Sequence, residues 1–437
     1  MKSAVIFCGV FLLLVTACGC EISKSGQDNS AFNTAPTMLA VLPAGYDLLD
    51  AVFSANGKHV MIAATKDGKV SLFYDSQMSM SYDEIRGMVF RNGYSDHAYV
   101  ARKGEKNTVV VKGVLGKPYD SIGIPIFIPD GNIVYPARLN NHWFIVAGNN
   151  IGQNFDSSSP APAIITNGNI IAYAERKSDA NKYNLNVCSP DLKECVKGKD
   201  YDFITGLIAN SSNKAIAYIA VNNGKTTVVN IHFSQTGIVE SEGRWYDEVS
   251  IARYSNNGDH IAYLAKAEHR AILVKDGVET MTDNYDVVFD MAVSAQGKVI
   301  HSAILKGQVA AYIDGKKRSK AYNGVDDLRL SPDGDNYVFS AEKGDKSIVV
   351  INGKETQIFD RVVTPKFSPD GSKIVYRARS KGERFVVVAD LKGRAVREHP
   401  HYESVWDVSF SSDGKLLGYG VKTGQEFWWK VEKLNEE

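Results

Sequence analysis

Residues 359–378, FDRVVTPKFSPDGSKIVYRA, contain the two landmarks that decide the fold of this 437-residue chain. The first landmark is the aromatic-acid pair Phe359-Asp360, and a pair of this type occurs ten times at intervals of 36 to 46 residues. The ten pairs are Tyr46-Asp47, Tyr82-Asp83, Tyr119-Asp120, Phe155-Asp156, Tyr201-Asp202, Tyr246-Asp247, Tyr285-Asp286, Tyr322-Asn323, Phe359-Asp360 and Tyr402-Glu403. Such a regular interval is typical of one supersecondary unit repeated in tandem.

The second landmark is a turn eleven to thirteen residues after each aromatic residue, which falls at Gly371 in this repeat. Short runs rich in β-branched and aromatic residues lie on both sides of the turn and are typical of strands. Asp276-Gly277 and Asn352-Gly353 indicate two-residue hairpins, because both turn positions require positive φ. Each unit is therefore predicted to be a four-stranded meander, and the chain to be an all-β protein, a β-propeller of about ten such repeats.

The two ends of the chain predict a closed ring. The last repeat stops after its third strand, at residues 426–431, whereas residues 38–43 have the character of a fourth strand that belongs to no preceding repeat. Pairing of these N-terminal and C-terminal strands would complete the last unit and cover an exposed sheet edge. Residues 38–437 are therefore assigned to the propeller. Two smaller rings are the alternative, because propellers typically have four to eight blades.

Two of the turns carry a recognisable pattern. Residues 331–334 and 368–371 both read Ser-Pro-Asp-Gly, and with their flanks they resemble the WD40-like repeats of TolB-type propellers. The proline fixes φ, the serine and aspartate bond to nearby amides, and the glycine takes the positive φ, so the pattern specifies a turn and no activity. The resemblance implies an envelope-located propeller that acts through protein contacts. The sequence has no counterpart of the N-terminal domain that accompanies the TolB propeller, so the role of that protein is not carried over.

The first residues are typical of an export signal, with Lys2 followed by an apolar run too short to be a permanent membrane span. Residues 15–18, VTAC, resemble a bacterial lipobox, which implies removal of residues 1–17 and attachment of a lipid to Cys18. Cys20 is the competing lipidation site, and a plain secretory signal is the alternative. Residues 18–37 are small and polar and are expected to form a flexible tether. We therefore expect an exported, lipid-anchored protein, on the periplasmic face of the outer membrane if the source is Gram-negative.

Two further cysteines, Cys188 and Cys195, flank the turn-like Ser189-Pro190-Asp191. Exported proteins retain disulfides, so we expect a bridge that makes one hairpin rigid without carrying the fold. Two cysteines alone offer too few ligands for a structural metal.

Composition and motifs exclude several function classes. Fifty basic and fifty acidic residues give a formal charge of zero, so no overall field attracts nucleic acid or an anionic membrane. The sequence contains no G-x-S-x-G, H-E-x-x-H, P-loop or EF-hand pattern. We therefore predict no catalysis, no cofactor, no nucleic acid partner and no membrane contact beyond the lipid.

The acid of each repeated pair has two interpretations. Directed into a central channel, the acids would form a ring of negative charge that attracts a cation or a basic partner. Alternatively, each acid accepts backbone amide hydrogen bonds at a turn, and the aromatic residue packs between blades. The sequence favours this structural interpretation, because a short polar side chain recurs at each blade junction. The predicted turn residues are Asp47, Asp83, Asp120, Asp156, Asp202, Asp247, Asp286 and Asp360.

Repeat proteins bind through their departures from the repeat, and three units here are enlarged. Near these units we select Trp245, His399, His401 and Trp406 as candidate partner contacts. The two histidines could also hold a metal, although a polar loop is the favoured interpretation. The leading hypothesis is a non-enzymatic scaffold for an envelope protein or peptide. The alternatives are an enzyme or a small-ligand or glycan-binding protein that uses the channel mouth, and a self-assembling structural surface protein.

Overall fold

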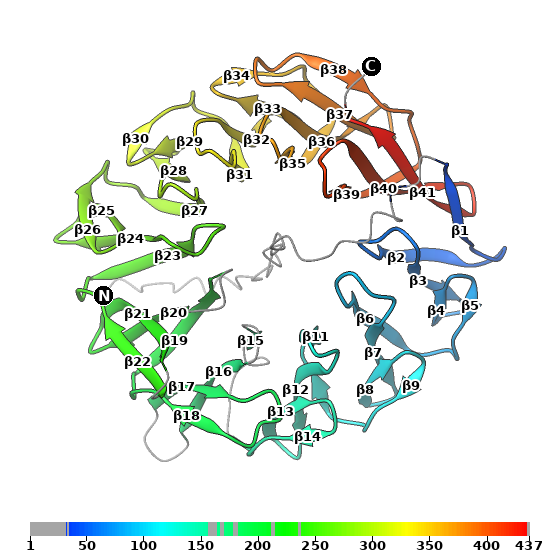
Figure 1. The fold of residues 1–437 in the computed structure, drawn as a ribbon, viewed down its shortest axis with the longest axis horizontal. Helices are drawn as coiled ribbons and strands as arrows, with labels where there is room; N and C mark the ends of the chain where they lie inside the picture. Colours follow the sequence, from blue (N-terminus) through cyan, green and yellow to red (C-terminus); the bar gives the residue numbers. More distant parts are fainter. Residues whose placement is uncertain are drawn as a thin grey trace, which may run out of the picture.

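The computed structural model describes residues 32, 35–155, 164–166, 170–177, 182–210, 215–234 and 237–434. In this part of the chain the strands form ten antiparallel sheets, which stand side by side as the blades of one ring (Figure 1). The first strand of each blade lies nearest the centre of the ring, and the fourth lies at the rim (Figure 1). The predicted all-β propeller of ten four-stranded repeats is confirmed. The described residues include no helix of the length and apolar character that a membrane span requires.

The strands follow the repeat without interruption. Blades 1 to 5 contain, in order, β2 (Asp47–Phe53), β3 (Val60–Lys66), β4 (Lys69–Tyr74) and β5 (Gln77–Met78); β6 (Glu84–Phe90), β7 (His97–Lys103), β8 (Lys106–Val111) and β9 (Val114–Leu115); β10 (Ser121–Ile122), β11 (Ile126–Phe127), β12 (Ile133–Leu139), β13 (His142–Ala147) and β14 (Asn150–Ile151); β15 (Ile164–Thr166), β16 (Ile171–Lys177), β17 (Lys182–Cys188) and β18 (Cys195–Lys197); β19 (Phe203–Ala209), β20 (Ala215–Asn222), β21 (Lys225–Ser234) and β22 (Gly237–Glu242). In blade 3 the first strand is divided into β10 and β11, which both pair with β12.

The second half of the ring has the same plan. Blades 6 to 10 contain, in order, β23 (Glu248–Tyr254), β24 (Ile261–Ala267), β25 (Arg270–Lys275) and β26 (Val278–Met281); β27 (Val287–Val293), β28 (Val299–Leu305), β29 (Gln308–Ile313) and β30 (Lys316–Lys317); β31 (Gly324–Leu330), β32 (Tyr337–Lys343), β33 (Lys346–Ile351) and β34 (Lys354–Glu355); β35 (Arg361–Phe367), β36 (Lys373–Ser380), β37 (Glu383–Asp390) and β38 (Ala395–Glu398); β39 (Ser404–Phe410), β40 (Leu416–Thr423), β41 (Glu426–Lys433) and the N-terminal β1 (Thr37–Val41).

The N-terminal strand closes the ring. β1 pairs with β41 as the fourth strand of blade 10, so the first and last strands of the chain lie side by side there (Figure 1). Ala40 and Phe427 of blade 10 pack in one core cluster with Ile62 of blade 1, so blade 10 is joined to blade 1 by apolar contacts. The predicted closure is confirmed, and the alternative of two smaller rings is wrong. Phe32, 8% exposed, also packs against this blade.

The repeated aromatic residue packs between neighbouring blades. In seven blades its ring meets an aromatic ring on the second strand edge to face, with centroids 5.1 to 6.4 Å apart and planes at 68 to 75°. The seven pairs are Tyr82–Tyr99, Tyr119–Tyr135, Tyr201–Tyr218, Tyr246–Tyr263, Tyr285–His301, Tyr322–Phe339 and Phe359–Tyr376. Because edge-to-face pairs contribute about 0.5–1.5 kcal/mol each beyond area burial, one sequence signal stabilises most of the junctions.

The repeated acid accepts hydrogen bonds at the turn between the second and third strands. Asp83 Oδ2 accepts the amide of Gly104 at 2.6 Å, and its Oδ1 accepts Lys69 Nζ from the preceding blade at 2.5 Å. These hydrogen bonds hold the pKa of Asp83 below its usual value. The equivalent amide bonds are made by Asp120, Asp202, Asp247, Asp286, Asn323, Asp360 and Glu403. These contacts match the structural interpretation of the acids. Asp47 begins β2, and Asp156 lies outside the described residues.

Candidate functional site

The four candidate contact residues lie in three separate parts of the ring, and they differ in what they offer a partner. Trp245 connects blade 5 to blade 6 and lines a cleft. His399 and His401 connect blade 9 to blade 10, and Trp406 lies on β39, the innermost strand of blade 10. The structure therefore does not assemble them into one site.

His399 is not a surface residue, which corrects its selection as a partner contact. It is 2% exposed, and its Nδ1 lies 3.0 Å from the hydroxyl of Tyr419 on β40. Burial, reinforced by the nearby Arg397, lowers the pKa of His399 to about 4, so the ring is neutral at pH 7. The sequence could not show this, because an alternation of His, Pro and His occurs both in loops and at the edge of a core.

His401 is partly exposed and is held by two carboxylates. Its Nε2 lies 2.9 Å from Glu398 Oε1 and its Nδ1 lies 3.0 Å from Glu383 Oε2, while the ring stacks on Phe385 with centroids 4.0 Å apart. The hydrogen bond to Glu398, followed by that to Glu383, raises the pKa of His401. Among the described residues no group of three metal-ligating side chains is placed to hold an ion.

Trp406 contributes to ring closure. Its indole packs against Phe53 of blade 1 with ring centroids 5.2 Å apart, and against Phe427 of its own blade at 5.8 Å. The side chain is partly buried and belongs to the apolar contact between the last and first blades. This leaves Trp245 as the selected residue with the best access to a hollow surface.

The cleft beside Trp245 lies at the rim of blade 5 and has a volume of about 490 Å³. Its lining combines amides, lysines, acids and two aromatic rings. The lining residues are Lys199, Asp200, Tyr201, Asn222, Asn223, Lys225, Glu242 and Trp245. They come from the segment before β19, the turn between β20 and β21, the end of β22 and the segment after it. All of them belong to the two longest intervals of the repeat.

Glu242 is the centre of the polar contacts in this cleft. Its Oε1 accepts hydrogen bonds from the hydroxyl of Tyr201 at 3.0 Å and from Nζ of Lys199 at 2.9 Å. The bond from Lys199 is the main reason that the pKa of Glu242 lies below its usual value, and the same bond raises the pKa of Lys199. At pH 7 the cleft therefore presents a fixed carboxylate with a cation beside it.

Trp245 and Lys225 form the other wall. The Trp245 ring is half-buried and lies 6.3 Å from the ring of Tyr201, centroid to centroid, at 42°. Lys225 pairs with Asp247, the repeated acid of the next blade. The cleft thus offers an aromatic edge, fixed charges of both signs and amide side chains. Its described lining contains no cysteine or histidine.

Lys199 and Glu242 were not selected from the sequence. Lys199 had no distinctive signal, because a basic residue also stands two positions before the repeated tyrosine at Lys117, Arg244 and Lys320. Glu242 had no such signal, since its position depends on the register of β22 against β21, where it pairs with Val229.

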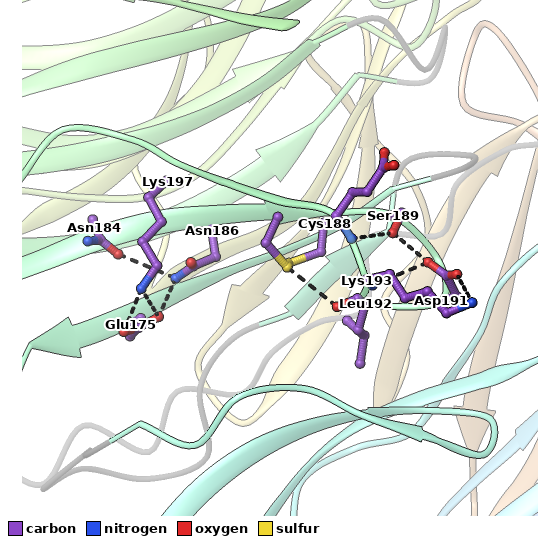
Figure 2. The surroundings of a disulfide bond; sticks show 11 residues. Glu175, Asn184, Asn186, Cys188, Ser189, Asp191, Leu192, Lys193 and Lys197 are labelled. Atoms are coloured by element: carbon purple, nitrogen blue, oxygen red, sulfur yellow. Dashed lines mark hydrogen bonds and ion pairs between the residues drawn. A yellow bond between two sulfur atoms is a disulfide. The ribbon is translucent and has the colours of Figure 1, made fainter.

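A disulfide joins Cys188 and Cys195 on the adjacent strands β17 and β18 of blade 4 (Figure 2). Ser189 Oγ donates to Asp191 Oδ1 at 2.6 Å in the hairpin turn, the same contact that Ser331 and Asp333 make in the Ser-Pro-Asp-Gly turn of blade 8. The disulfide and the serine-aspartate bond therefore hold the two ends of one short turn. The bridge lies in the blade that precedes the cleft.

No protein-family model matches the sequence, and no curated protein matches it either. Among solved structures, a eukaryotic initiation factor is similar over 84% of this chain and 92% of its own, at 9% identity and a TM-score of 0.49. The Dos1 propeller covers 94% and 98%, at 11% identity and a TM-score of 0.41. TolB from Acinetobacter baumannii covers 62% and 76%, at 16% identity and a TM-score of 0.30. None of these likenesses bears on what this protein binds.

Proposed function

We propose that this protein is a lipid-anchored, non-catalytic scaffold of the cell envelope that binds another protein or a peptide through the cleft on blade 5. The observation that carries the proposal is the cleft itself, where Trp245 lies beside the fixed Lys199–Glu242 pair. Trp245 stands immediately before the repeated Tyr246, and its ring packs against the apolar cluster of blade 5 while it also lines the cleft. Blade 5 is therefore the part of the ring where the repeat departs furthest from its structural role.

The chemistry of the cleft favours a peptide as the ligand. A half-buried tryptophan supplies a rigid apolar contact of the kind that dominates protein interfaces. The carboxylate of Glu242 and the ammonium groups of Lys199 and Lys225 lie around it and can pair with side chains of opposite charge. Asn222 and Asn223 add amide donors and acceptors, which suit a peptide backbone.

The anchor part of the proposal rests on the sequence. Residues 15–18, VTAC, resemble a lipobox, and Cys18 would then carry the lipid. Phe32 packs against Trp429 and Val431 of blade 10, fourteen residues after Cys18. A flexible chain of that length has a typical end-to-end distance of about 20 Å, which would hold blade 10 close to the membrane.

Site-specific photo-crosslinking in the native envelope tests the proposal. The photoreactive residue benzoylphenylalanine replaces Asn222 in the cleft, and in a matched control it replaces Lys103, the exposed residue at the same repeat position of blade 2. One protein that crosslinks at residue 222 and not at residue 103, and whose yield falls in the variant Glu242→Gln, supports the proposal. Equal yields at the two positions, or none, overturn it. A crosslink to a glycan at residue 222 would replace the peptide by a carbohydrate ligand.

A further inference from the structure

A second cleft, of about 400 Å³, lies at the rim of blade 8. It has the same mixture of lysines, acids, amides and a tyrosine as the cleft on blade 5. Its lining residues are Gly307, Gln308, Lys320, Ala321, Tyr322, Asn323, Glu342, Lys343 and Glu355. None of them belongs to an enlarged unit, so no feature of the sequence singles out this blade.

The two clefts occupy equivalent positions of the repeat. Tyr322 and Tyr201 are both the aromatic member of the repeated pair, and each is preceded two positions earlier by a lysine. Glu355 pairs with Val350, the fifth residue of the third strand of blade 8. Glu242 pairs with Val229, the fifth residue of the third strand of blade 5. The strand register thus places both glutamates at the same point of their blades.

The polar contacts of the two clefts also match. The hydroxyl of Tyr322 donates to Glu355 Oε1 at 3.3 Å, as Tyr201 does to Glu242. Lys320 Nζ lies 3.6 Å from Glu355 Oε1, and Lys343 Nζ lies 2.9 Å from Oε2. These cations hold the pKa of Glu355 below its usual value, with the bond from Lys343 as the main cause. Each cleft therefore holds a fixed carboxylate between a phenol and lysines.

This arrangement is not required by the fold. At the position of Glu242 and Glu355, five other blades carry side chains that cannot accept these hydrogen bonds: Met78, Leu115, Ile151, Lys197 and Lys317. In blade 9 the position is taken by Glu398, which has no phenol to accept because the repeated aromatic residue is Phe359, and which contacts His401 instead. Those blades close the same ring. The glutamate with its tyrosine and lysine is therefore a specialised feature of a few blades, and its recurrence beside two clefts points to a shared ligand.

Blade 6 provides a natural comparison. Glu279 has the equivalent place, accepts the hydroxyl of Tyr246 at 2.8 Å, and receives both contacts of Arg244 Nη1 at 3.0 and 3.1 Å. The guanidinium also lies over the Tyr246 ring, 5.5 Å from its centroid. In blade 6, Arg244 thus lies over the ring of Tyr246 and donates from one nitrogen to both oxygens of Glu279. The three side chains there form a contact between strands.

We propose that the cleft on blade 8 is a second binding site for the ligand of blade 5, a peptide segment that carries both acidic and basic side chains. The proposal rests on the proposed function of the blade 5 cleft. Each site is lined by two lysines and two acids, one of them the fixed glutamate, so a segment that carries charges of both signs can pair with it. A partner with two such segments engages both sites, and the second contact is then intramolecular, which raises the overall affinity without new chemistry.

The first experiment repeats the crosslinking in the native envelope with benzoylphenylalanine at Ala321, an exposed residue that lines the blade 8 cleft. The expected result is the partner that crosslinks at residue 222, recovered also at residue 321 and absent at residue 103. Recovery at residue 222 alone overturns the second site and leaves the proposed function standing. Recovery at residue 321 alone overturns the role of blade 5. No recovery at either position overturns both proposals.

The second experiment counts the sites. The partner peptide recovered at residue 222 is synthesised and titrated calorimetrically into the purified mature protein and into Glu355→Gln, Glu242→Gln and the matched control Glu279→Gln. We expect two peptides per ring for the parent and the control, and one for each of the other two variants. With the intact partner, either single variant should bind about ten-fold more weakly or worse. A stoichiometry of one in the parent, unchanged by Glu355→Gln, overturns the inference. Thermal unfolding shows whether each variant folds.

Discussion

Replacement of His301 by phenylalanine should stabilise the ring. His301 on β28 has no measurable exposure, and among the described residues neither of its ring nitrogens has a hydrogen-bond partner. In blade 8 the same place is taken by Phe339, which makes the same edge-to-face contact with the repeated tyrosine. Phenylalanine thus keeps the aromatic contact and removes the buried polar atoms.

The expected gain is about 1–3 kcal/mol at pH 7.5, the usual cost of one unsatisfied buried polar group. It grows in acid. Burial lowers the pKa of His301 from 6.5 to about 3, so below pH 6.5 the unfolded chain binds a proton that the folded protein does not. Stability is therefore lost as the pH falls from 6.5 towards 3, at up to about 1.4 kcal/mol per pH unit. At pH 5.0 the parent has lost about 2 kcal/mol of folding stability relative to pH 6.5. His301→Phe should not show this loss, because phenylalanine does not bind a proton.

Urea unfolding of both proteins at pH 7.5 and 5.0, followed by tryptophan fluorescence, measures the two effects. Tyr285 and Tyr312, which flank His301, do not titrate in this range, because burial raises the pKa of each. His399 is unchanged in both proteins, so its own acid effect cancels. His399→Phe is the control. It should lower the free energy of unfolding at pH 7.5, because it leaves the hydroxyl of Tyr419 without its present partner. The reasoning is refuted if the free energy of unfolding falls by the same amount between pH 7.5 and 5.0 in His301→Phe as in the parent. This comparison does not depend on how well the phenylalanine packs.

Substitutions at three further positions test the structure and the sequence. Cys188→Ser should lower the free energy of unfolding by about 2 kcal/mol or less and leave the ring intact, because the disulfide closes a short loop. Calorimetry measures this loss, and a protein that fails to fold would contradict the prediction. Asp360→Asn should lower Tm less than Asp360→Ala, because Asn can still accept the amide of Lys381 although it loses the ion pair with Lys346; equal losses would argue against the amide bond. The amide bond and Lys346 depress the pKa of Asp360, so its contribution should fade only as the pH drops below about 4, which thermal unfolding at pH 7 and 3 measures. Cys18→Ser should move the protein from the membrane fraction to the soluble fraction of the envelope, and unchanged partition would contradict lipidation at that residue.

Much of the ring could be predicted from local signals. The pair Tyr82-Asp83 shows why: the aromatic ring packs on Tyr99, and the acid accepts the amide of Gly104, both within the next twenty-one residues. When most junctions are built from the same two adjacent residues, the period of the pair gives the number of blades. The contacts of the pair are short-range in sequence, so their pattern survives in the sequence itself.

The candidate site was predicted only in part. Trp245 was selected because blade 5 is enlarged, and it lines a cleft. His399 was selected for its flanking residues and is buried, because the register of β40 places Tyr419 against it. Glu242 and Glu355 were missed, since their role depends on a strand pairing that places each beside a tyrosine more than thirty residues earlier in the chain.

Local signals in the sequence are enough to predict the repeat, the four-stranded unit and the strand at each end that completes the last blade, because turns and strand periodicity are set by neighbouring residues. The tertiary structure then settled whether the units close in one ring or in two, since closure depends on Ala40, Phe427 and Ile62 meeting across the whole length of the chain. It also decided which polar residues face a cleft. A side chain such as Glu355 is polar wherever it lies, and its partners are fixed by the register of distant strands.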